Sequence, residues 1–196
     1  NRNDRHRHRS RWNVARAVPH ASTRTRHLSV VAFNLGRRQE GLEAALTLDL
    51  PGLVYSFHFY EPHEFTHQGL PGQPAALVYP GQGWDKARLS QAMGEARKFA
   101  AKHRAPMYVG EFSCVRWAPG GSCPRYLADA VSLFETEAWS WTYHCWRCYQ
   151  GWDSEVPQHI PQAQRAGYLP AHRRADSPSL LLLRKAMERN RKSTRH

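Results

Sequence analysis

The sequence has no run of 18 apolar residues, and its first residues lack the apolar segment of a secretory signal. The first absence excludes a membrane-spanning helix, so we predict no membrane partner. The second leaves the compartment open, although the Arg- and Ser-rich, acid-poor start has some features of a transit peptide. Cysteine is also scarce, with four in 196 residues.

The middle of the chain lacks an excess of positive charge, and this limits the choice of partner. Residues 1–38 contain ten Arg and one acidic residue, and residues 165–196 contain nine basic and two acidic ones. The middle therefore keeps nine basic against thirteen acidic residues, although the whole chain has a formal charge of +12. Nucleic-acid binding without sequence preference usually needs a basic groove on the folded body, so this distribution argues against it.

Both ends of the chain are rich in charge and poor in apolar side chains, as in NRNDRHRHRSRW at the start. Such segments bury too little surface to offset the entropy lost on ordering. We predict a disordered basic tail over 1–28 and a short basic tail over 191–196. An arm that binds nucleic acid or another acidic surface is the alternative interpretation of the first tail.

The cysteines Cys114, Cys123, Cys145 and Cys148 do not form a recognisable metal motif. Zinc sites usually have two C-x-x-C knuckles, and only Cys145 and Cys148 have that spacing. A redox C-x-x-C normally opens a helix after a strand, whereas this one lies in an aromatic run, WTYHCWRCYQGW. A disulfide between Cys114 and Cys123 is compatible with their spacing but does not follow from it.

Three nearby histidines, His58, His63 and His67, were considered as metal ligands. Their spacing extends across a strand end and a proline-containing loop, which is not typical of a metal site. We therefore predict no metal and no other cofactor.

What the sequence does contain is a strand, a loop and a helix, three times in succession. A hydrophobic content of 41% in 196 residues suits one domain with a sizeable core. β-branched and aromatic residues indicate the strands, and apolar stripes at helical spacing indicate the helices. The predicted strands cover 53–60, 106–112 and 139–144, and the predicted helices cover 85–103, 124–137 and 177–190.

Each predicted helix has one apolar face, and the last one also has a start signal. Ser177 is a good N-cap residue, and Pro178 suits the first helical position. The apolar faces consist of Leu89, Met93, Ala96 and Ala100 in the first helix, Leu127, Ala130, Val131 and Phe134 in the second, and Leu180, Leu183 and Met187 in the third.

Strands that alternate with helices predict an α/β fold of parallel strands, either a doubly wound sheet or a (β/α)8 barrel. Polar and aromatic side chains occur where the strands end: His58 and Tyr60, then Glu111, then Trp141, Tyr143 and His144. In a barrel these ends converge on one mouth, where active sites are found. This convergence favours the barrel and makes Glu111 a candidate catalytic residue.

Three segments, VYSFHFYEP, PMYVGEFS and WSWTYHCWRCYQGW, resemble strands six, seven and eight of glycoside hydrolase family 5, the cellulase-type (β/α)8 enzymes. The resemblance covers about residues 53–190. It implies Glu111 as the catalytic nucleophile, His58 and Tyr60 as the pair beside it, and Trp141 beneath the sugar. Tyr143, His144 and Trp152 also match the family's pattern, and we assign them only to a wall of the sugar cleft. It also implies a retaining, double-displacement hydrolysis of O-glycosyl bonds in a β-linked carbohydrate substrate and favours a secreted or periplasmic location.

The chain departs from this family in two respects. It contains no Asn-Glu-Pro, the motif that carries the family's proton donor, and Glu61 in the look-alike Tyr-Glu-Pro matches the strand-six loop instead. A complete barrel needs about 250 residues, whereas three units here occupy 53–190. We therefore expect a partial (β/α)8 TIM barrel, about its last three βα units, that is inactive on its own.

Residues 29–52 form an uncertain connecting segment, with a strand suggested in HLSVVAFNL (27–35) and a short helix suggested at 37–48. Two other functions are kept as alternatives. One is a noncatalytic carbohydrate-binding remnant that uses its tryptophans as stacking surfaces. The other is nucleic-acid binding through the basic tails.

Overall fold

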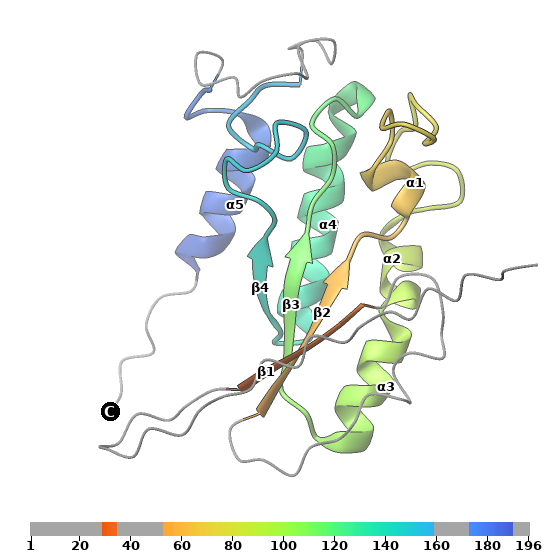
Figure 1. Ribbon diagram of the computed structural model, residues 1–196, viewed down its shortest axis with the longest axis vertical. Helices are drawn as coiled ribbons and strands as arrows, with labels where there is room; N and C mark the ends of the chain where they lie inside the picture. The colour runs from red at the N-terminus through yellow and green to blue at the C-terminus, as the bar shows by residue number, and fades with distance from the viewer. Residues whose placement is uncertain (1–28, 35–52, 159–172, 190–196) are drawn as a thin grey trace, which may run out of the picture.

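The computed structural model describes residues 29–34, 53–158 and 173–189 (Figure 1). The tails predicted at 1–28 and 191–196, and the helix suggested at 37–48, lie outside these residues. Among the described helices, none combines the length and apolar character needed to cross a bilayer.

In the described part of the chain, four parallel strands form one sheet in the order β1-β2-β3-β4. The strands are β1 Ser29–Asn34, β2 Leu53–Phe59, β3 Met107–Phe112 and β4 Ser140–Tyr143. The three predicted strands are confirmed, and the strand suggested within 27–35 is confirmed as β1. The carboxyl ends of β2, β3 and β4 therefore meet at one edge of the sheet (Figure 1).

The helices follow the strands as predicted, with one interruption. They are α1 His63–Thr66, α2 Lys86–Ala92, α3 Gly94–His103, the 3-10 turn η2 Pro119–Gly121, α4 Ser122–Thr136 and α5 Pro178–Glu188. The single helix predicted over 85–103 is divided at Met93, directly before Gly94, a residue of low helix propensity. Its apolar stripe survives the break, because Leu89, Met93 and Ala96 are all fully buried.

An aromatic layer holds the helices against one face of the sheet. Tyr55 of β2 packs against Phe99 of α3, with ring centroids 4.9 Å apart. Phe59 of β2 and Phe112 of β3 both pack edge-on against Phe134 of α4, at 5.6 and 5.1 Å. Because α3 and α4 cover the same face, the apolar side chains of β2 and β3 point toward them, and the opposite face is left for other residues.

Helix α4 is tied to the end of β3 by a covalent bond as well as by packing. The four residues of its predicted apolar face are all buried, which confirms the stripe. A disulfide joins Cys114, just after β3, to Cys123 in the first turn of α4. The structure thereby decides a pairing that the spacing alone left open.

Helix α5 confirms its predicted start but not its whole predicted stripe. The side chain of Ser177 accepts a hydrogen bond from the Leu180 backbone N–H at 3.3 Å, and Pro178 opens the helix. Leu180 and Leu183 are buried as expected, but the prediction that Met187 is buried is wrong, because 49% of this residue is exposed. Met187 lies along a hollow beside β4, where nothing in the described residues covers it.

Replacing Phe134 with Ala tests the aromatic layer. Phe134 is fully buried and contacts two strands, so we expect its truncation to reduce the free energy of unfolding by about 3–5 kcal/mol. Urea denaturation of the 196-residue chain measures the loss. The matched control is Leu181→Ala on α5, where half of the side chain is exposed and a change within about 0.5 kcal/mol is expected. Equal losses in both variants would contradict this account of the core.

Candidate active site at the strand ends

A bulge in β3 determines where Glu111 points. The pairing of β2 with β3 runs from Phe57 opposite Val109 directly to His58 opposite Glu111, which leaves Gly110 as an extra residue. Bulges of this kind occur next to active sites, where they re-aim a side chain. As a result, Glu111 lies beside His58 on the face of the sheet away from the helices.

The extra residue has to be small. A Cβ atom built on Gly110 would collide with the hydroxyl oxygen of Ser56 and lie within 3.6 Å of the His58 ring. A larger residue would therefore have to displace the Ser56 hydroxyl, next to the point where His58 and Glu111 pair. The glycine before Glu111 is thus explained by the close approach of the two strands.

Three side chains surround the carboxylate of Glu111. One lies on β2, one on the residue directly after β2, and one on the residue directly after β4. The hydroxyl of Tyr60 donates a hydrogen bond to Oε2 at 3.1 Å. The Nδ1 atom of His58 lies 3.3 Å from the same oxygen, and Nδ1 of His144 lies 4.0 Å from Oε1. About a third of each side chain in the Glu111, His58 and His144 group is exposed, so the carboxylate can be reached from solvent.

Burial sets the protonation of the groups around this carboxylate. It raises the pKa of the Tyr60 hydroxyl far above its ordinary value, and the nearby Glu111 raises it further. Tyr60 therefore remains a hydrogen-bond donor at any physiological pH. Burial also lowers the pKa of His58, against the opposing charge of Glu111 and with a smaller contribution from His144. His58 is therefore neutral near neutral pH.

An indole stands beside this group. The ring of Trp152 stacks on Tyr60, with centroids 5.5 Å apart and planes 28° from parallel. The rings of His144 and His67 meet the Trp152 ring at steeper angles, at 5.4 and 5.3 Å. Burial is the main cause that lowers the pKa of His67 to about 4. Trp152, Tyr60 and His144 thus form one side of the space in front of Glu111.

Trp141, which the sequence placed at this rim, lies on the other face of the sheet. It is opposite Val109 in the β3–β4 pairing, and its ring packs edge-on against buried Phe112 at 5.6 Å. Side chains alternate between faces along a strand, so Thr142 and His144 share the side of Glu111 while Trp141 and Tyr143 do not. The placement predicted for Trp141 is therefore wrong, whereas His144, which was assigned only to a wall of the sugar cleft, lies 4.0 Å from Glu111.

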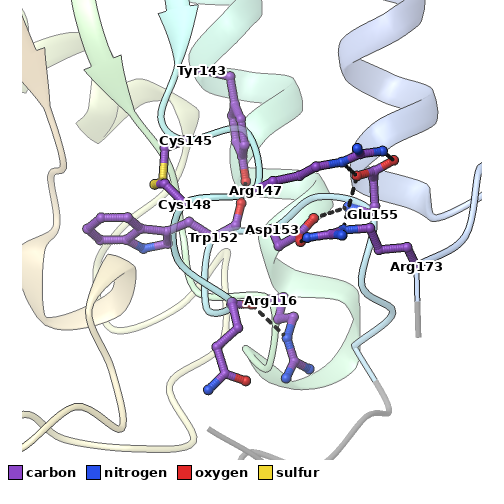
Figure 2. Close-up of polar contacts among 10 residues, drawn as sticks. Arg116, Tyr143, Cys145, Arg147, Cys148, Trp152, Asp153, Glu155 and Arg173 are labelled. Atoms are coloured by element: carbon purple, nitrogen blue, oxygen red, sulfur yellow. Dashed lines mark hydrogen bonds and ion pairs between the residues drawn. A yellow bond between two sulfur atoms is a disulfide. The ribbon is translucent and has the colours of Figure 1, made fainter. Parts of the chain in front are cut away.

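The loop after β4 is held by charged and covalent contacts, shown in Figure 2. Arg147 binds Glu155 through two hydrogen bonds of 2.7 and 3.1 Å. Arg173 binds Asp153 at 2.9 and 3.0 Å and lies 3.3 Å from Glu155. These contacts bracket the turn that carries Trp152, and they fix its indole next to Tyr60.

A metal site was also considered within this loop. His144, Cys145 and Cys148 are the one group of close metal-binding side chains found among the described residues. The two cysteines form a disulfide, however, so neither provides a thiolate ligand. The other three histidines lie in two separate places. His63 stacks on His67 at 4.0 Å, whereas His58 contacts Glu111.

Comparisons with known proteins agree with the likeness seen in the sequence. No protein-family model matches the chain. Endoglucanase C of Acetivibrio thermocellus is 27% identical over 140 residues, which cover 57% of this chain and 40% of that protein. Endoglucanase C307 of Clostridium sp. (strain F1) has the same identity and coverage. The chain spans about 40% of the length of these curated relatives.

Solved structures show the same partial match. Cel5A of Thermotoga maritima in complex with cellobiose has a TM-score of 0.58 at 20% identity and covers 74% of this chain and 44% of its own. The endoglucanase Cel5A from the same organism also has a TM-score of 0.58, at 22% identity. The match covers 81% of this chain and 48% of that one. The cellulose synthase subunit Z of Clostridioides difficile has a TM-score of 0.56 at 20% identity, with 74% and 45% covered.

The Cel5A neighbours are TIM-barrel cellulases, and the α/β unit with its parallel sheet has the fold of part of such a barrel. Over that part of its length, the chain is similar in sequence to these endoglucanases, which supports the resemblance to the cellulase-type proteins of glycoside hydrolase family 5.

The ion pairs of the loop predict how stability depends on pH. Hydrogen bonds from Arg147 chiefly hold the pKa of Glu155 below its ordinary value, against the opposing effect of burial, and the charge of Arg173 adds to the lowering. A carboxyl group with a lowered folded-state pKa stabilises the fold above its unfolded pKa, and this contribution is lost as the pH falls through the folded value. Glu155→Gln should therefore lower the urea midpoint at about pH 7, and this difference should shrink as the pH falls from about 5 toward 3.

Urea midpoints measured across this pH range check the prediction. Glu188→Gln on α5, an exposed position, is the control and should leave the midpoint unchanged throughout. If the difference in urea midpoint between the wild type and Glu155→Gln stays constant with pH, the Glu155 charge does not stabilise the loop.

Proposed function

We propose that this chain provides the nucleophilic half of a retaining glycoside hydrolase that acts on O-glycosyl bonds of a β-linked polysaccharide or glycoside. The observation that carries the proposal is the Glu111 carboxylate, held by the Tyr60 hydroxyl at 3.1 Å and near His58 at 3.3 Å, at the carboxyl edge of a parallel sheet. Active sites of barrel enzymes lie at this edge.

The proposed chemistry needs an ionised carboxylate at the anomeric carbon. Glu111 would attack that carbon as its bond to the leaving oxygen breaks, which forms a glycosyl ester; water then hydrolyses this ester and regenerates the carboxylate. The Tyr60 hydroxyl and the His58 ring keep the carboxylate in one orientation, which reduces the entropy lost on reaching the attacking geometry. Trp152 and Tyr60 together offer an aromatic surface for the C–H face of a sugar ring.

A retaining enzyme also needs a second carboxyl group, about 5 Å from the first, to protonate the leaving oxygen. In the related family this group belongs to an Asn-Glu-Pro motif, which the sequence does not contain. We infer that residues 53–190 correspond to the C-terminal part of a barrel, about its last three βα units, and that the proton donor comes from outside this chain. The chain alone should then fail to hydrolyse substrates with poor leaving groups.

The comparisons support the substrate class. The curated relatives are endoglucanases, and Cel5A structures contain cellobiose or mannotriose. A β-linked gluco- or manno-oligosaccharide is therefore the first ligand to test.

The stacked Tyr60 and Trp152 pair favours one other candidate function. These rings could bind a sugar without any reaction at Glu111, as a noncatalytic carbohydrate-binding remnant would. This alternative and the proposed one both require sugar binding, and they differ only in whether a covalent bond to Glu111 forms.

A fluorinated glycoside with a good leaving group separates the two functions in the chain as it is. In 2,4-dinitrophenyl 2-deoxy-2-fluoro-β-cellobioside, the phenolate departs without protonation, so no acid residue is needed. We expect Glu111 to acquire one fluorocellobiosyl group as an ester, with release of one dinitrophenolate. Intact-protein mass spectrometry and peptide mapping measure the label and its position.

Two variants control the labelling experiment. Glu111→Gln should remain unlabelled, whereas Glu64→Gln, which removes an exposed carboxylate of α1, should be labelled like the wild type. Labelling of Glu111→Gln at the wild-type rate would refute Glu111 as the nucleophile. Binding of cellobiose without labelling of the wild type would favour the noncatalytic alternative.

A further inference from the structure

We propose that reduction of the disulfide between Cys145 and Cys148 converts the start of the loop after β4 into a binding site for a divalent metal ion. The ligands are the imidazole of His144 and the thiolates of the two cysteines. The ion is one that takes nitrogen and sulfur ligands in a tetrahedral arrangement, with Zn²⁺ as the first choice. The proposal goes beyond the glycosidase function and does not rest on it, because it concerns only the binding of an ion.

The three ligands already lie together. One ligand atom from each of His144, Cys145 and Cys148 lies within 4.8 Å of the other two, and residues 29–34, 53–158 and 173–189 contain no second group of this kind. The Cα atoms of the two cysteines are 5.6 Å apart, and C-x-x-C is the usual spacing of cysteine pairs that bind zinc. Bonds of about 2.0 Å to nitrogen and about 2.3 Å to sulfur put tetrahedral ligand atoms within about 4 Å of one another. Short movements of the side chains therefore suffice once the sulfur atoms separate.

The disulfide of this loop is accessible, unlike the other disulfide of the described chain. Cys148 is exposed, whereas Cys114 and Cys123 are only 0% and 2% exposed. Exchange between a thiol and a disulfide requires that the attacking thiolate reach one of the sulfur atoms. A reductant should therefore open the bond between Cys145 and Cys148 first and leave the one that anchors α4 intact.

The reductant is a dithiol, and the exchange balances in two steps. One of its thiolates attacks Sγ of Cys148, forms a mixed disulfide there and releases the Cys145 thiolate. The second thiol of the reductant then attacks its own sulfur in that mixed disulfide and releases Cys148. Two electrons have passed to the protein, and the reductant ends as its own disulfide. Any proton that either cysteine carries passes to water when the metal binds.

Contacts that do not involve sulfur hold the ligands in place after reduction. The backbone N–H of His144 donates a hydrogen bond to the Phe112 carbonyl oxygen at 3.1 Å. Arg147, which lies between the two cysteines, binds Glu155 at 2.7 and 3.1 Å (Figure 2). The reduced loop thus stays anchored at its start and between its cysteines. A site that is held in this way loses less conformational entropy when it binds its ligand.

The metal would lie at the edge of the candidate active site. Nδ1 of His144 is 4.0 Å from Oε1 of Glu111, and its ring is 5.4 Å from the ring of Trp152. Glu111 does not belong to the group of close metal-binding side chains, so the carboxylate and the metal site remain separate. The redox state of the loop would then decide whether His144 faces Glu111 freely or is bound to an ion.

A titration with Co²⁺ tests the site. The full 196-residue chain is reduced without oxygen by tris(2-carboxyethyl)phosphine, which adds no thiol that could bind the metal, and is then freed of reductant by gel filtration. We expect one Co²⁺ per chain to give thiolate-to-cobalt charge-transfer absorption, which histidines elsewhere in the sequence cannot produce. The unreduced chain should not show this absorption. Zn²⁺ should displace Co²⁺ and abolish it, because such sites bind Zn²⁺ more tightly.

Two variants identify the ligands, and a third is the matched control. Cys148→Ser should abolish the charge-transfer absorption. His144→Ala should weaken Co²⁺ binding by at least the roughly tenfold that the loss of an outer-shell partner of a metal site costs. His67→Ala is the control, because the His67 ring also contacts Trp152, at 5.3 Å, but does not belong to the group. It should bind Co²⁺ as the wild type does.

Alkylation of the reduced wild type tests the same ligands without any substitution. Zn²⁺ should slow the reaction of Cys145 and Cys148 with iodoacetamide, as measured by peptide mass spectrometry. Equal alkylation rates with and without Zn²⁺, or no charge-transfer absorption from the reduced wild type, would overturn the proposal. So would wild-type absorption in Cys148→Ser, or equal weakening in the two histidine variants. Circular dichroism should show that the reduced wild type stays folded, and unfolding on reduction alone would also contradict the proposed site.

Discussion

The one extra residue in β3 is the constraint on which the site depends. Without the bulge at Gly110, strict alternation after buried Val109 would turn both Glu111 and Phe112 to the opposite sides of the sheet. With it, Phe112 stays in the aromatic layer against α4, and Glu111 faces Tyr60 and His58. A single backbone irregularity therefore keeps both Val109 and Phe112 in the core while Glu111, between them, reaches the site.

Most of the fold could be predicted from the sequence because its signals are local. Aromatic and β-branched runs predicted the strands, and Ser177 with Pro178 predicted the start of α5. The break before Gly94 was missed because the apolar stripe continues through it. The disulfide between Cys114 and Cys123 was left open because pairing depends on distances in space.

The site was predicted less completely, for a similar reason. Glu111, His58 and Tyr60 follow from the strand ends, and the structure brings all three together. Trp141 was chosen by residue type and position in the motif, but the pleat turns it toward α5. Trp152 was assigned to a wall of the sugar cleft by resemblance alone, because no periodicity places a residue of this loop, and its contact with Tyr60 appears only in three dimensions.

Tyr143 links the two faces of the sheet. Its ring packs against Phe112 in the core, while its hydroxyl donates to the backbone oxygen of Trp152 at 2.6 Å and accepts from Ser113 at 3.2 Å. The aromatic wall is thus anchored from behind, through a residue that does not touch Glu111. Substitutions at Tyr143 would change the position of the Trp152 wall, and with it the affinity for a sugar, without altering the Glu111 carboxylate. Sugar affinity and reactivity can therefore change independently during evolution.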